Sequence, residues 1–200
     1  MIIGPKFKKA RKLGVPVFEK TQTPKFAAYL AKKGKPPGRG NKSDYGAQML
    51  EKQRARFSYG VNEKQFYNYV KAALNEKGDT SVALLRMLEG RLDNVVLRLR
   101  ISPTRSAARQ AVSHRHITVN GKVVTIPSYQ VSLGDVIGIR EGSRNMTIFV
   151  SVWEKAKKAP VPAWLKCDFD KNCAVIDGEP KIAQTELLFN VKSVLEYYTR

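Results

Sequence analysis

The sequence predicts an α+β protein, in which a mostly helical domain carries an inserted module of one helix, a β-hairpin and a small antiparallel sheet. Two patterns support this prediction. From Leu84 to Leu99 the apolar residues recur every three or four positions, as they do on the buried face of helices. After Ser113 the period becomes two around Asn120-Gly121, the strongest short-range signal of a hairpin turn. Because 42% of the 200 residues are hydrophobic, the chain can bury a core of ordinary size.

The first 42 residues are expected to form a basic, loop-rich arm. The glycine- and proline-rich segment 34–40 interrupts regular structure, and only a short helix is predicted before it, over Phe26–Lys33. Basic residues are scattered along this part of the chain, and few apolar residues are available for a core. We therefore expect residues 1–42 to be ordered best against a partner that neutralises their charge.

Capping signals predict two helices in the next segment. Ser43 is a suitable N-cap for a helix that runs to about Tyr59. Asn62 begins a second helix, in which Gln65 stands where a capping box needs it, and Gly78 follows the end of its apolar face. These two helices are expected to form the body of the helical domain.

A third helical stretch opens at residue 80 or 81. Gly90 divides it into two short helices, whose leucines we assign to the core. A helix is also predicted over Asn145–Lys158, and extended pieces follow it. The helical domain is therefore expected to comprise residues 43–91 and to be completed by residues 141–200.

Residues 92–140 are expected to form the inserted module. Thr104 is the N-cap of a short helix that ends at Ser113, and Arg105 and Arg109 lie four positions apart on it, so that both guanidinium groups project from one face. Guanidinium groups make bidentate contacts with phosphate. The spacing therefore predicts a compact platform for phosphate groups. Further amide, imidazole and ammonium donors of this platform come from Gln110, His114, Asn120 and Lys122.

Positive charge is concentrated in the N-terminal part of the chain. The formal net charge is +19, of which residues 1–60 carry +12, residues 61–150 carry +6 and residues 151–200 carry +1. Such a gradient predicts a polyanionic partner, and nucleic acid fits it best. An anionic membrane surface and a merely solubilising surface are the alternatives, but no long amphipathic basic helix is evident.

Other features bound the class of protein. No stretch approaches the roughly 18 apolar residues that a membrane crossing needs, and the start of the chain lacks the apolar region of a secretory signal. The two cysteines, Cys167 and Cys173, cannot support a disulfide framework. We therefore expect a cytoplasmic protein without membrane association.

A set of motifs along the chain resembles one known family. The segment 104–114 (TRSAARQAVSH), followed by 117–122 (ITVNGK), is similar to the small RNA-binding module named after ribosomal protein S4. Around it, the segments 88–96 (LEGRLDNVV), 162–165 (PAWL) and 195–200 (LEYYTR) resemble the body of the bacterial-type S4 family of the small (30S) ribosomal subunit. The resemblance covers nearly the whole length, with the motifs in the order of the family.

The resemblance implies a structural protein of the small ribosomal subunit. Family members bind small-subunit ribosomal RNA directly, nucleate assembly of its 5′ domain, lie near the messenger-RNA entrance beside neighbouring small-subunit proteins, and contribute to translational accuracy. In relatives, the loop before Ser43 is basic and faces the path of the messenger RNA. In this chain only Arg39 and Lys42 remain as basic residues close to that loop, so we expect a weaker contact with messenger RNA. The other residues expected to face RNA are Arg54, Arg91, Arg105, Arg109, Gln110, His114, Asn120 and Lys122, joined by Lys8, Lys9, Arg11 and Lys12 of the arm.

The resemblance also bears on metal binding. Some family members hold zinc through cysteines in the N-terminal segment, but residues 1–60 of this chain contain no cysteine. Cys167 and Cys173 lie far from that segment, and no histidine is near them in the sequence. The chain thus resembles the zinc-free form of the family, and we expect neither a metal nor a cofactor.

Two alternatives remain open. A free-standing RNA-binding factor would need only residues 92–140, but it leaves the basic arm unexplained. An RNA pseudouridine synthase is suggested by the segment 90–93 (GRLD), which resembles the motif around the catalytic aspartate of those enzymes. In them, however, the RNA-binding module precedes the motif, and here too few residues follow the hairpin for an ordinary catalytic domain. We therefore expect no enzyme, and we expect Asp93 to lie on a helix surface and to orient a neighbouring basic side chain.

Overall fold

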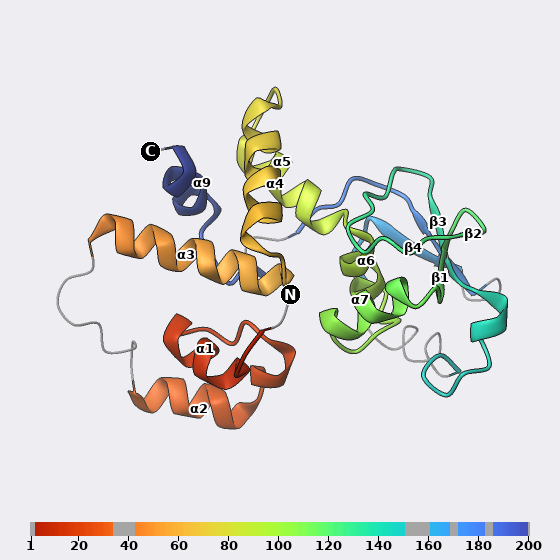
Figure 1. Ribbon diagram of the computed structural model, residues 1–200, viewed down its shortest axis with the longest axis horizontal. Helices are drawn as coiled ribbons and strands as arrows, with labels where there is room; N and C mark the ends of the chain where they lie inside the picture. Colours follow the sequence, from red (N-terminus) through yellow and green to blue (C-terminus); the bar gives the residue numbers. More distant parts are fainter. Residues whose placement is uncertain (1–2, 34–42, 151–160, 169–171, 183–185, 200) are drawn as a thin grey trace. The chain divides into compact units, whose positions relative to one another are not determined.

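In the computed structural model, the chain forms two compact units (Figure 1). The structure describes residues 3–33, 43–150, 161–168, 172–182 and 186–199. One unit comprises residues 1–84 with 183–200, and its described part is helical. The other comprises residues 85–182 and contains a sheet covered by helices. The α+β class predicted from the sequence is confirmed.

The beginning of the N-terminal unit is more regular than the predicted arm. It forms α1 (Lys6–Leu13), the 3₁₀ turn η1 (Glu19–Thr21) and α2 (Pro24–Lys33). The expectation of a loop-rich arm therefore fails for residues 3–33, because their few apolar side chains are spaced so that they meet in a small core. The predicted loop at 34–40 lies outside the described residues. Buried in that core are Ala10, Leu13, Val17, Phe18 and Phe26.

The next two helices, α3 (Asp44–Tyr59) and α4 (Glu63–Asn75), begin at the predicted caps. The Ser43 Oγ accepts a hydrogen bond from a backbone N–H of the first turn of α3 at 3.3 Å. The Asn62 side chain accepts one from the Gln65 N–H at 2.8 Å. These bonds satisfy amide groups that have no partner within their own helix. The helix α5 (Thr80–Glu89) follows α4 in the chain.

The C-terminal helix α9 (Val191–Thr199) returns to the N-terminal unit and lies against α3 (Figure 1). Lys52 of α3 is buried beneath it, with its Nζ 2.9 Å from Glu63 Oε1 and 4.5 Å from the centre of the Tyr197 ring. The Tyr198 hydroxyl donates to the same Glu63 oxygen at 2.8 Å. A carboxylate from α4 and a ring from α9 thus compensate the burial of one ammonium group.

Glu63 makes this packing sensitive to acid. Partial burial opposes its ionisation, but hydrogen bonds from Lys52 and Tyr198 outweigh burial and hold the pKa of the Glu63 carboxyl below its ordinary value of 4.5. A carboxyl with a lowered folded pKa stabilises the fold above its unfolded pKa, and this contribution is lost as the pH falls through the folded pKa.

We therefore expect the N-terminal unit to lose stability as the pH falls below 4.5. Glu63→Gln should reduce this acid-induced loss in the free energy of unfolding. The reduction should be less than about 1 kcal/mol, since water screens a side chain that is 44% exposed. Thermal unfolding followed by circular dichroism across this pH range measures the effect. A profile that is identical in the two proteins would contradict it.

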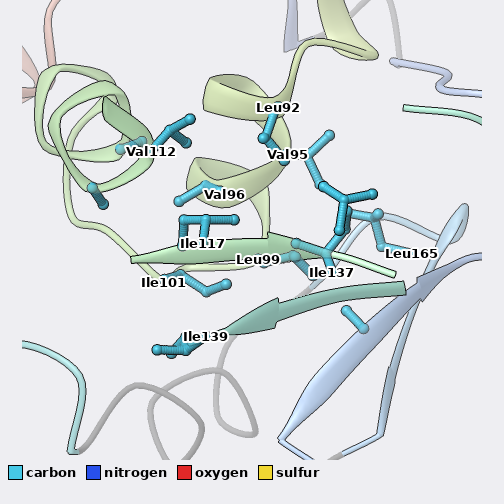
Figure 2. Packing of buried hydrophobic residues seen from close by; sticks show 14 of the residues in the cluster. Leu92, Val95, Val96, Leu99, Ile101, Val112, Ile117, Ile137, Ile139 and Leu165 are labelled. Atoms are coloured by element: carbon cyan, nitrogen blue, oxygen red, sulfur yellow. The ribbon is translucent and has the colours of Figure 1, made fainter. Parts of the chain in front are cut away.

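In the described part of residues 85–182, five antiparallel strands form one sheet in the order β2-β1-β3-β5-β4. These strands are β1 (Ile117–Val119), β2 (Lys122–Val123), β3 (Val136–Ile139), β4 (Leu165–Asp168) and β5 (Cys173–Ile176). The helices α6 (Leu92–Arg98) and α7 (Arg105–Ser113) supply the other side of the core. Figure 2 shows Val95 and Val96 of α6 and Val112 of α7 gathered against Ile117 and Ile137 of the sheet.

Residues 141–200 are divided between the two units, whereas the sequence assigns all of them to the helical domain. β5 pairs with β3, and β4 pairs with β5, so both strands extend the sheet of the module. Alternate residues of β5, Ala174 and Ile176, are buried and explain this placement. Of the helix predicted over Asn145–Lys158, residues 145–150 form turns, and the rest lies outside the described residues.

Candidate nucleic-acid interface

The helix α7 has one buried and one exposed side. The Thr104 Oγ1 caps its N-terminus by accepting a hydrogen bond at 3.2 Å from a backbone N–H of the first turn. Ala108, Ala111 and Val112 are buried against the core, while Gln110 is exposed. The small alanine side chains let the helix lie close to its neighbours. Packing therefore fixes the position from which the polar side chains of α7 extend.

The two arginines of α7 are held by polar groups of α6. The Arg109 Nε donates to Asp93 Oδ2 at 2.9 Å, and an Nη of Arg105 donates to Asn94 Oδ1. The Arg109 side chain is 28% exposed, so it lies at the surface of the unit. The structure thus brings together the predicted pair, Arg105 and Arg109, and orients both guanidinium groups by contacts inside the unit.

Asp93 is fully buried and paired with two arginines. Besides its ion pair with Arg109, Asp93 accepts two hydrogen bonds from Arg91. The Arg91 Nε donates to Oδ1 at 3.0 Å, and the Nη2 donates to Oδ2 at 2.8 Å. Burying a carboxylate is costly unless it is paired and hydrogen-bonded, as it is here. The prediction that Asp93 orients a neighbouring basic side chain is confirmed, whereas the prediction that it lies on a helix surface is wrong. Arg91, which we predicted to face RNA, is only 2% exposed and lies inside the unit.

A second buried carboxylate, Glu89, is absent from the predicted set. It is 1% exposed and accepts hydrogen bonds from Arg98 Nε at 2.9 Å and from Asn94 Nδ2 at 2.8 Å. Asn94 also accepts a hydrogen bond from Arg105, so its side chain links Glu89 to α7. One pattern in the sequence could have indicated this buried carboxylate. Charged residues cluster within an otherwise apolar segment, 89–98 (EGRLDNVVLR).

The turn between α5 and α6 places these polar groups. The Gly90 carbonyl accepts a hydrogen bond from the Val131 N–H at 2.9 Å, and the Asp93 N–H donates to the Pro127 carbonyl at 3.1 Å. A Cβ added at Gly90 would lie 3.0 Å from the Arg86 carbonyl oxygen and 3.1 Å from Gln130 Oε1. Glycine is therefore the residue that lets the start of α6 lie this close to residues 127–131.

The hairpin uses its predicted residues in two different ways. Asn120 has a φ of +51°, in the left-handed region that a tight hairpin turn requires. Its side chain donates to Asp135 Oδ1 at 2.8 Å and accepts from the Val136 N–H at 2.9 Å, so it secures the start of β3. Lys122 on the edge strand β2 and His114 at the end of α7 are exposed and can reach a ligand.

The basic residues of α1 are mostly exposed. Lys8, Arg11 and Lys12 face solvent, whereas Lys9 is half-buried, with its Nζ 4.8 Å from the centre of the Phe57 ring. This surface belongs to the N-terminal unit. The remaining predicted residues of the arm, Arg39 and Lys42, lie outside the described residues.

Arg54 of α3, also predicted to face RNA, ties α1 to α3. Its Nε and Nη2 donate to the Leu13 carbonyl at 3.0 and 2.7 Å, and it forms an ion pair with Glu51. The last carbonyl groups of a helix have no partner within that helix, so a guanidinium group suits this place. Arg54 therefore positions the basic surface of α1.

Two further arginines near the end of β3 were not predicted. The Arg140 N–H donates to the His116 carbonyl at 2.9 Å, which places Arg140 beside the start of β1. The His116 Nδ1 lies 2.9 Å from Ser143 Oγ, and Arg140 and Arg144 are both exposed. The position of these arginines beside the start of β1 results from the pairing of β1 with β3. That pairing joins distant parts of the sequence, so it could not be predicted from local patterns.

Other chemistry finds little support in the described part of the chain. Its residues include no group of three or more histidine, cysteine, aspartate or glutamate side chains placed to hold a metal ion. Nor does any helix among them have the length and apolar character for crossing a membrane. Burial raises the pKa of the Cys167 thiol, which lies on β4. A raised pKa makes this thiol a poor nucleophile.

Comparisons with known proteins agree with this picture. The family profile described as ribosomal protein S4/S9 N-terminal domain matches residues 1–89, and the one described as S4 domain matches residues 90–137. The small ribosomal subunit protein uS4 of Parabacteroides distasonis is 43% identical to this chain over 98% of each protein. That of Chromobacterium violaceum is 41% identical over 99% of this chain and 98% of its own. That of Chlorobium luteolum is 40% identical over 96% of each.

Proposed function

Because the chain belongs to the bacterial-type ribosomal protein uS4 family, we propose that it binds the 5′ domain of small-subunit ribosomal RNA and nucleates the assembly of that domain. As a member of this family, it is a structural, rRNA-binding protein of the small ribosomal subunit and not an enzyme. The geometry of Asp93 agrees with a non-catalytic role, since a carboxylate held by two arginines inside the core cannot reach a substrate.

The observation that carries the proposal is the orientation of the α7 arginine pair, Arg105 and Arg109. Asn94 and Asp93 hold their guanidinium groups, so less side-chain entropy is lost when an RNA phosphate binds. Guanidinium groups also match the geometry of phosphate. A rigid pair accepts only certain arrangements of phosphates, which favours recognition of RNA by its shape.

A second basic surface, on α1 of the N-terminal unit, supports the same proposal. Residues 3–33 contain nine basic residues and one acidic residue. Neutralising phosphates with such residues releases counterions from the RNA and drives binding without reading its sequence. We therefore assign affinity mainly to the α1 surface, and selection of a particular fold of the RNA mainly to the α7 arginine pair.

A footprinting experiment tests the nucleation step. The 5′-domain RNA is probed chemically alone and with the full chain, and other proteins of the small subunit are then titrated onto both samples. We expect protections clustered where RNA helices meet, and tighter binding of the later proteins when the chain is already present. Protections scattered over the RNA would contradict nucleation. So would equal binding of the later proteins to the RNA with and without the chain.

The messenger-side role is proposed on narrower grounds. The support is the charge of Arg39 and Lys42, which precede Ser43, together with the family resemblance. Beside neighbouring small-subunit proteins, these two residues would contact messenger RNA at its entrance and affect accuracy.

Arg39→Ala combined with Lys42→Ala should therefore change misreading a few-fold in reconstituted ribosomes, since an ion pair formed in water contributes about 0.2–1 kcal/mol. Binding of the 5′ domain should stay as in the unaltered chain. Misreading that is also unchanged would contradict the messenger-side role.

A further inference from the structure

A pocket of about 300 Å³ lies in the N-terminal unit, where α1 and α2 lie side by side (Figure 1). This volume is at the lower end of the range for sites that bind small molecules. The wall is aromatic and the rim is basic and polar. The pocket is lined by Phe7 and Arg11 of α1, by Lys25, Phe26 and Tyr29 of α2, and by Thr23 before α2. We call it the aromatic pocket.

Three rings form the wall of the aromatic pocket. Phe26 is buried, packs edge-on against Phe7 at 6.0 Å between ring centres, and stacks with Tyr29 at 6.1 Å. Phe7, in contrast, is 46% exposed. Phe26 therefore belongs to the small core of this unit, whereas a large part of the Phe7 ring is open to a flat apolar group.

The rim carries positive charge. The Arg11 Cζ lies 5.8 Å from the centre of the Tyr29 ring, and the Arg11 Nε donates to the Phe7 carbonyl at 3.3 Å. Lys25 and Thr23, which also line the pocket, are exposed. The guanidinium group of Arg11 is therefore held at the rim, where an ammonium group and a hydroxyl accompany it.

Aromatic wall and basic rim together indicate the kind of ligand. A free phosphate would use the cations and leave the rings exposed, and an apolar side chain of a protein would use the rings and desolvate the cations. A nucleotide of single-stranded RNA uses both, since its base stacks on aromatic rings while its phosphate pairs with basic groups. The strongly basic composition of residues 3–33 adds attraction for a polyanion.

We propose that the aromatic pocket takes one unstacked base of ribosomal RNA, with the base against Phe7 and Tyr29 and a neighbouring phosphate beside Arg11 and Lys25. The inference rests on the rRNA binding proposed above and deepens it, since it adds a contact to a single-stranded nucleotide. It gives the N-terminal unit a role in reading RNA structure, besides the attraction that its charge provides.

Substitutions at Phe7 in the full chain test the proposal, with 5′-domain RNA and a short oligoriboadenylate as the two probes. Phe7→Ala should weaken oligoriboadenylate binding about 5- to 150-fold, the range for removal of one stacked base. Phe7→Trp should restore it, because stacking needs a ring, and Phe7→Leu should not. The matched control is Tyr67→Ala, which removes a ring of similar exposure (49%) on α4, outside the pocket.

The possible outcomes separate this proposal from the proposed function. Equal affinity of Phe7→Ala and Tyr67→Ala for the oligoriboadenylate would overturn the base pocket. Full rescue by leucine would also overturn it, in favour of an apolar protein side chain as the occupant. If the unaltered chain does not distinguish 5′-domain RNA from another structured RNA, the proposed function fails instead. Equal thermal unfolding of the Phe7 variants confirms that they share one fold.

Discussion

Replacing Asp93 with alanine is expected to lower the free energy of unfolding of the sheet-containing unit by about 3–5 kcal/mol. Asp93 is fully buried, and its removal breaks the ion pair with Arg91, whose side chain is itself only 2% exposed. It also removes the ion pair that joins Arg109 of α7 to α6. Both tryptophans of the sequence, Trp153 and Trp164, belong to residues 85–182, so urea unfolding followed by tryptophan fluorescence reports on this unit within the full chain.

The control for this variant is Asp177→Ala, which removes an exposed aspartate from the same unit. A surface substitution of this kind is expected to change the free energy of unfolding by no more than about 0.5 kcal/mol. If Asp93→Ala were as mild as Asp177→Ala, the ion pairs of Asp93 would not be holding α6 and α7 together. The proposed orientation of the α7 arginine pair would then lose its basis.

The second large effect is expected on RNA binding. Lys8 and Lys12 are exposed and four positions apart on α1, so they lie on one face of the helix. Replacing both with glutamine should lower the slope of log affinity against log salt by about 2, since each lysine–phosphate pair contributes about 1. Removal of each ammonium group should weaken binding to the 5′ domain about tenfold, because a hydrogen bond to a charged group is worth about 1.5 kcal/mol.

A matched pair separates this effect from net charge alone. Lys166→Gln combined with Lys192→Gln removes two exposed lysines from the part of the chain that is nearly neutral. We expect this control to leave the salt slope almost unchanged. Equal slopes in the two double variants would mean that α1 contributes charge and no defined phosphate contacts.

Features encoded within a few residues were predicted from the sequence. Ser43, Asn62 and Thr104 cap their helices as predicted, because a cap depends only on the first turn that follows it. The turn at Asn120-Gly121 is equally local, since it depends on two residues that tolerate a positive φ. For the same reason the exposed face of α7, with Gln110, could be read from helical spacing.

Features that depend on distant contacts could not be predicted in this way. Arg54 bonds to the carbonyl of Leu13, and β5 pairs with β3, so in both cases the partner is far away in the sequence. Arg91 was misplaced for a related reason: its partner Asp93 is only two positions away, but the burial of both residues depends on packing against distant segments such as residues 127–131. The sequence therefore reveals which residues are basic, while the fold decides which of them can face RNA.

The central claim is that the chain recognises a folded part of ribosomal RNA and is not merely a polycation. The most direct measurement compares its binding to the 5′ domain of small-subunit rRNA with binding to an unrelated structured RNA of equal length, at low and near-physiological salt. Non-specific binding falls by orders of magnitude as salt rises. We predict that binding to the 5′ domain survives while binding to the control RNA disappears. An equal decrease for both RNAs would contradict the claim and favour a general RNA-binding protein.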